Sequence, residues 1–141
     1  MNEGDRKPWI PITLIVGAVY CLIGFSFGVF ASWSKSFQLV VAWRVASFVV
    51  SAIVFALHIG YEHFRFRHRA VSVALHTSLA VALGAFGLAV IANVHAFGVA
   101  QANHRMLALS LIIWPLMTGL PAFLVALITA AGLRLVQPQT G

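Results

Sequence analysis

Acidic side chains are nearly absent from this sequence. Charged residues make up only 9% of the chain, and its three acids, Glu3, Asp5 and Glu62, stand against nine Lys and Arg. Soluble domains are close to one quarter charged, so this composition excludes an ordinary soluble domain. Ion-coupled carriers place a carboxylate deep inside a span. The lack of such a residue argues against a small multidrug-type cation exporter.

Cysteine and catalytic motifs are also scarce. The single cysteine, Cys21, excludes an intrachain disulfide. The sequence has no nucleophile-elbow serine, phosphate-binding loop, zinc-protease motif or Cys-x-x-Cys pair. The histidines outside the apolar runs show no zinc-like spacing. We therefore expect no catalytic residue, no metal site and no enzymatic activity. The first eight residues carry both charge signs, which is not typical of a cleavable signal peptide.

Long apolar runs dominate what remains. The chain is 61% hydrophobic, and its mean hydropathy is +0.96. A length of 141 residues holds about four spans of ~20–25 residues with short connections. The sequence thus predicts an all-α, four-helix transmembrane bundle in a single domain with short loops. The expected spans cover residues 10–31, 37–60, 70–93 and 106–133.

Basic residues are distributed unevenly between the two ends of the predicted spans. One end carries Arg6, Lys7, Arg65, Arg67, Arg69 and Arg134, and the other carries Lys35, Arg44 and Arg105. This bias predicts cytoplasmic N- and C-termini, in a bacterial inner membrane. The pI near 10.9 arises from these connections, so we expect no nucleic-acid partner. Arg65, Arg67 and Arg69 are expected to contact anionic lipid headgroups.

Polar side chains follow one face of the second predicted span. Arg44, Ser47, Ser51 and His58 fall within about 60° of one another on a helix. Ionisable groups inside a span usually face the protein interior, so this face is expected to line it. The remaining predicted inner surface comprises Thr13, Gly17, Tyr20, Gly24, His76, Gly84, Gly87, Ser110, Thr118 and Thr129.

Two histidines are candidate cofactor ligands. His58 and His76 lie on neighbouring spans, each about 13 Å from the intervening turn at 1.5 Å per residue. Paired imidazoles hold haem b in membrane bundles, whereas the simpler interpretation is two hydrogen-bonded structural histidines. Glu62 shares the helix face of His58 and can orient its ring. We favour instead an interfacial Glu62 that balances Arg65 or Arg69.

Arg44 is the third candidate. Antiparallel register predicts that it lies near Val90–Asn93, where the Asn93 carbonyl can accept from the guanidinium. There it can bind a haem propionate, a quinone oxygen, a lipid phosphate or a transported anion. The structural alternative is a side chain that extends to the membrane interface.

Three functional hypotheses follow from these features. The leading hypothesis is an accessory or scaffold subunit that packs with other membrane helices or with its own copies, because small residues line the helix faces. The second is a redox module that binds haem b or a quinone through His58, His76 and Arg44. The third is a small channel or carrier for an anion or neutral solute, with Arg44 in its polar interior.

Overall fold

Four long helices make up the protein. The computed structural model describes residues 9–66, 69–96 and 103–136. The helices are α1 (Trp9–Trp33), α2 (Phe37–Phe66), α3 (Ala70–Ala96) and α4 (His104–Val136). Each is long and apolar enough to cross a membrane. The prediction of an all-α fold with four helices long and apolar enough to span a membrane is therefore confirmed.

Short polar side chains cap two of the helix starts. The Ser36 hydroxyl accepts from the backbone N–H of Leu39 at 3.3 Å, as an N-cap does at the start of α2. The Asn103 side-chain oxygen accepts from the N–H of Met106 at 3.3 Å before α4. These caps satisfy backbone donors that a helix start leaves unpaired, and they fix where α2 and α4 begin.

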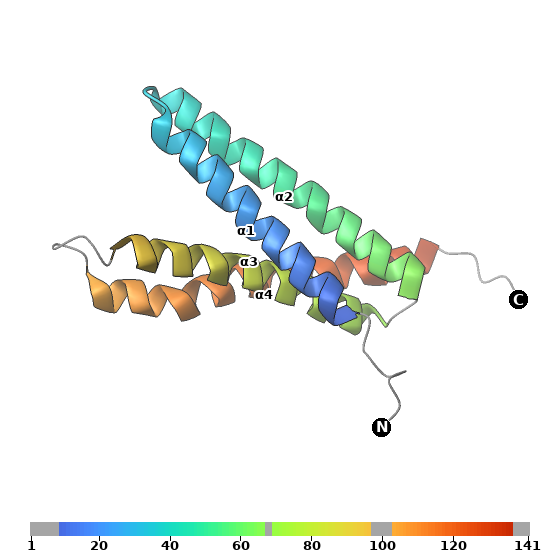
Figure 1. The fold of residues 1–141 in the computed structure, drawn as a ribbon. Coiled ribbons are helices and arrows are strands. Elements are labelled where there is room, and N and C mark those ends of the chain that lie inside the picture. The colour runs from blue at the N-terminus through green and yellow to red at the C-terminus, as the bar shows by residue number, and fades with distance from the viewer. Residues whose placement is uncertain (1–8, 67–68, 97–102, 137–141) are drawn as a thin grey trace, which may run out of the picture.

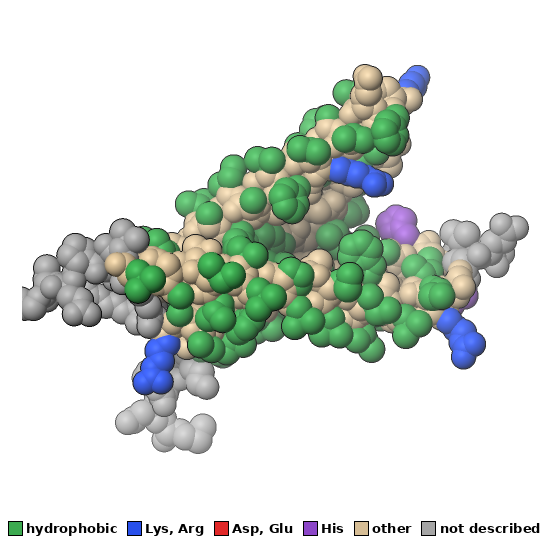
Figure 2. All heavy atoms as spheres, turned by 180° about the vertical axis from the view of Figure 1, so that it is seen from behind, with side chains coloured by type: hydrophobic (Ala, Val, Ile, Leu, Met, Phe, Trp, Pro, Cys, Tyr) green, Lys and Arg blue, Asp and Glu red, His purple; other side chains and the backbone are tan. Residues whose placement is uncertain are grey.

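The helices form two hairpins that diverge. α1 pairs with α2, α3 pairs with α4 along their lengths, and α1 also packs on α3. α2 reaches α3 and α4 over a short stretch only, and the α1–α2 connection lies far from the second hairpin (Figure 1). The face seen in Figure 2 is mostly hydrophobic, and none of the described side chains drawn there is acidic.

Glycines allow α1 to approach α3 closely. A Cβ atom on Gly84 would lie 2.5 Å from the Cβ of Tyr20, and one on Gly17 would lie 3.0 Å from the Cβ of Leu83. Further along α1, a Cβ on Gly24 would meet Leu88 at 2.5 Å. The contacts advance in the same direction on both helices, so α1 and α3 run parallel. The expected small-residue packing of these two faces is therefore present.

The apolar core lies where the hairpins join. Its buried members are Ile59 of α2, Val73 and Ala74 of α3, and Ala126 and Ala130 of α4. α2 continues as a helix past residue 60, where the expected span ends, to Phe66, and Ile59 brings this part of α2 to the core. Gly60 stays inside the helix, where a glycine lowers stability but does not end the helix.

The divergence of the two hairpins also changes which residues form the predicted inner surface. Thr129 is exposed, and its hydroxyl donates to the Val125 carbonyl of its own helix at 2.8 Å. Its placement inside the bundle is wrong. The other polar residues are divided among the contacts between different helix pairs, so the described residues do not share one continuous polar interior.

Candidate functional site

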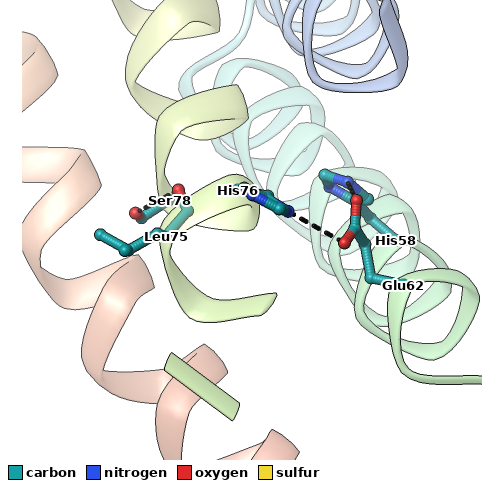
Figure 3. A network of polar contacts seen from close by, with 5 residues as sticks. All are labelled: His58, Glu62, Leu75, His76 and Ser78. Carbon is teal, nitrogen blue, oxygen red and sulfur yellow. Dashed lines mark hydrogen bonds and ion pairs between the residues drawn. The ribbon is translucent and has the colours of Figure 1, made fainter. Parts of the chain in front are cut away.

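A buried carboxylate lies between two histidines at the junction of the hairpins (Figure 3). Glu62 is 0% exposed and His58 is 4% exposed. The Nδ1 of His76 donates to Oε2 of Glu62 at 3.0 Å, while Nε2 of His58 is 3.8 Å from Oε1. The first distance is a hydrogen bond, and the second is an ion-pair distance when His58 is protonated.

Three helices position these groups. His58 and Glu62 are one turn apart on α2, so both side chains point in the same direction. His76 approaches from α3, and its ring stacks on Trp9 of α1 with centroids 4.3 Å apart and planes 6° apart. The contact between His76 and Glu62 therefore joins one hairpin to the other, and Trp9 fixes the imidazole plane.

Several polar atoms near this junction have unused hydrogen-bonding capacity. Within the described residues, both ring nitrogens of His58, Oε1 of Glu62 and Nδ1 of His63 are buried without a hydrogen-bond partner. The hydroxyls of Thr13 and Thr77 are in the same condition. Buried polar atoms are normally paired, so this part of the protein can accept further hydrogen bonds or protons.

The site does not fit a haem held by both histidines. The Glu62 carboxylate lies between the two rings, and His76 directs Nδ1 at that carboxylate (Figure 3). Two axial imidazoles must face one iron from opposite sides, so Glu62 would have to leave this position. Among the described residues, no group of three His, Cys, Asp or Glu is placed to hold a metal ion.

Arg44 is separated from the two histidines. It precedes His58 by fourteen residues on α2, which is about 21 Å of helix at 1.5 Å per residue. It lines a groove of about 440 Å³ between α1 and α2, together with Gly24, Gly28 and Ser47. His58, His76 and Arg44 therefore do not converge on one ligand.

Asn93 has other partners. Its amide Nδ2 donates to the carbonyl of Leu107 at 2.8 Å and to the hydroxyl of Ser110 at 3.3 Å, which ties α3 to α4. The placement of Arg44 near Val90–Asn93 stays a prediction, and the side chain of Asn93 is used in the contact with α4.

The remaining predicted polar residues lie in separate places. Tyr20 is buried between α1 and α3, whereas Ser51 is half-buried on α2. The hydroxyl of Thr118 donates to the Trp114 carbonyl within α4 at 2.9 Å. Ser110 donates to the Leu107 carbonyl at 2.6 Å and also accepts from α3. These contacts stabilise helix pairs and single helices.

The basic connection after α2 is only partly described. Arg69 is exposed, as a headgroup-contacting residue would be. Arg67 and the side chain of Arg65 lie outside the described residues. The preferred interpretation of Glu62 as an interfacial residue that balances Arg65 or Arg69 is wrong, because Glu62 is fully buried against His76.

Sequence reasoning missed the burial of His63 and the role of Trp9. His63 is 5% exposed, and Trp9 stacks on His76. For the junction itself, the available signal was the spacing of His58 and Glu62, which places both on one helix face.

Comparison of the chain with protein-family models, with curated proteins and with solved structures finds no match. The fold and the junction thus define the class, an all-helical protein of two hairpins with four helices apolar enough to cross a membrane, joined by a buried His–Glu–His contact. Any assignment beyond this class depends on the chemistry of its surfaces.

Proposed function

We propose that the protein is an accessory or scaffold subunit of a membrane assembly. In this proposal α2 packs against a transmembrane helix of another subunit, in a bacterial inner membrane with both termini cytoplasmic. The observation that supports it is the exposure of α2. None of the residues in its most apolar stretch is buried, whereas α1 and α3 bury 11% and 17% of theirs.

The exposed side of α2 has the shape that helix packing requires. Ala52, Ala56 and Gly60 follow one another at four-residue spacing, and both alanines are exposed. A Cβ atom on Gly60 would meet no atom within 4 Å. Small residues at this spacing let a second helix approach closely, which is how helices associate in lipid. We call Ala52, Ala56 and Gly60 the small-residue face of α2.

Photo-crosslinking in native membranes tests this proposal. A photoreactive amino acid is placed at Ala56, and in a matched protein at Ile128 of α4, which is 72% exposed. Ile128 is eight residues from the end of its helix and Ala56 is ten from the end of α2, so both lie at a similar depth. We expect a discrete protein product at Ala56 and only lipid adducts at Ile128.

A second variant tests whether the small-residue face itself is used. Ala56→Leu adds bulk to the face, so a crosslink from position 52 should disappear, while Ile128→Ala should leave it intact. Mass spectrometry of the product identifies the partner peptide as another subunit or a second copy. A chain that stays monomeric in mild detergent and gives equal, diffuse labelling at both positions would contradict the proposal.

A further inference from the structure

The groove between α1 and α2 contains a cation that lies far from Glu62, the acidic side chain that the structure describes. Arg44 is exposed at the wall of this groove, inside the apolar span of α2. The recorded ion pairs of the described residues all involve Glu62, which follows Arg44 by eighteen residues or about 27 Å of helix. A charge inside a span is stable only with a partner or a route to water.

The other two acids of the sequence belong to the segment before α1. Glu3 and Asp5 precede Trp9 in the sequence, whereas Gly24 of the groove follows Trp9 by fifteen residues, about 22 Å of helix. A second copy inserted with the same topology has the same distribution of acids along its sequence. A different molecule can therefore supply the counter-charge of Arg44.

The depth of Arg44 indicates which molecule that is. Arg44 follows the first residue of α2, Phe37, by seven residues, which is about 10 Å of helix. An arginine at this distance from a helix end can extend along the helix toward the lipid phosphates. The guanidinium matches a phosphate because it donates two parallel N–H bonds.

The groove has space for such a headgroup next to Arg44. A Cβ atom on Gly28 would meet no atom within 4 Å, and Ser47 adds a half-buried hydroxyl one turn from Arg44. An aromatic cluster lies beside the groove, with the Trp43 ring centroid 5.1 Å from that of Phe30. These rings fix the spacing of α1 and α2, so the groove is held open.

We propose that this groove binds the phosphate of an anionic phospholipid in the leaflet nearer the α1–α2 connection. Arg44 donates two hydrogen bonds to the phosphate oxygens, the Ser47 hydroxyl donates a third, and the open side of Gly28 admits the headgroup. The site is independent of the small-residue face of α2, which lies about 120° around the helix by residue count.

Lipid binding by the purified full chain tests the site. Delipidated protein in detergent is titrated with dioleoylphosphatidylglycerol or with zwitterionic dioleoylphosphatidylcholine, and bound lipids are counted by native mass spectrometry. We expect one tightly bound phosphatidylglycerol. Arg44→Gln should weaken its binding about tenfold because a charge-assisted bidentate contact is lost. Arg44→Gln removes a charged side chain from the apolar span of α2, so the fold should persist.

Two further variants separate the groove from general surface charge. Gly28→Leu keeps Arg44 but fills the groove, and should weaken phosphatidylglycerol binding to a similar degree. Lys35→Gln removes an exposed cation at the same membrane end and should change binding less than about twofold. Loss of binding in Lys35→Gln equal to that in Arg44→Gln would overturn the proposal, as would unchanged binding in Arg44→Gln.

Inorganic phosphate distinguishes a lipid site from a free-anion site. Millimolar phosphate is added to the delipidated protein, and thermal unfolding is followed with and without phosphatidylglycerol. The proposal predicts stabilisation by the lipid alone. Stabilisation by inorganic phosphate that depends on Arg44 would overturn it in favour of a soluble-anion site.

Discussion

Removal of the Glu62 carboxylate should release the two hairpins from each other. Glu62→Leu removes the carboxylate that accepts from Nδ1 of His76 and that lies 3.8 Å from Nε2 of His58, in a part of the protein where Glu62 is 0% exposed and His58 is 4% exposed. Removing one partner of a buried ionic pair costs about 3–5 kcal/mol in soluble proteins. Hydrogen bonds between transmembrane helices are weaker, about 0.6 kcal/mol on average and up to about 1.7 kcal/mol.

These two ranges measure different quantities. The single substitution includes the penalty for removing the carboxylate from two buried imidazoles, so we expect Glu62→Leu to lower the free energy of unfolding by about 2–4 kcal/mol. The coupling between Glu62 and His76 in a double-mutant cycle excludes that penalty and should be about 1–2 kcal/mol. Glu62→Gln keeps a carbonyl that accepts from His76, so it should lose less than Glu62→Leu.

Denaturant unfolding in mixed micelles, followed by tryptophan fluorescence, measures these losses. Trp9 stacks on His76 at 4.3 Å and reports on the junction directly. Thr129→Val is the matched control, because its exposed hydroxyl bonds only within α4. If Glu62→Leu unfolds at the same denaturant concentration as the wild type and the cycle gives no coupling, the junction does not hold the hairpins together.

Two other contacts should contribute to stability in different ways. Gly84→Leu should destabilise the protein by at least about 1–3 kcal/mol, because even a Cβ at Gly84 would lie 2.5 Å from the Cβ of Tyr20. Gly132→Leu is the control, since a Cβ there would meet no atom within 4 Å. Thermal unfolding compares the two variants. Asn93→Leu should cost about 1 kcal/mol by removing the 2.8 Å hydrogen bond to the Leu107 carbonyl, and faster amide hydrogen exchange at the start of α4 would report the looser helix pair. An unchanged unfolding temperature in Gly84→Leu, or unchanged exchange in Asn93→Leu, would refute the respective packing argument.

The four helices could be predicted because each depends on its own sequence. Runs of apolar residues long enough to span a bilayer are a local property, and the predicted ranges each lie inside one helix. The end of α2 depends on another part of the chain. Hydropathy falls at Glu62 and His63, yet both are buried because α3 and α4 cover this end of α2. The local pattern therefore placed the end of the expected span six residues before the end of the helix.

The candidate site was predictable in part for the same reason. Helical spacing placed His58 and Glu62 on one face, and the hairpin geometry brought His76 to a similar depth. Residue spacing shows which side chains share a helix face, but it does not determine which neighbouring helix that face contacts. Arg44 shares the face of Ser47, as expected, and that part of the face lines a groove with α1. The angle between the hairpins decides this, and it depends on packing at their junction.

The exposure of α2 follows from where the two hairpins are joined. Their apolar core and the Glu62 contact lie at one end, so the other half of α2 is paired with α1 alone. That half carries the basic groove at Arg44, whereas the small-residue face begins at Ala52 and continues to Gly60 in the half that holds the junction. They are about 120° apart by residue count and about 18 Å apart along the helix between Arg44 and Ala56. Substitutions at this separation act independently. Ala56→Leu should therefore abolish the crosslink without altering lipid binding, and Gly28→Leu should do the reverse.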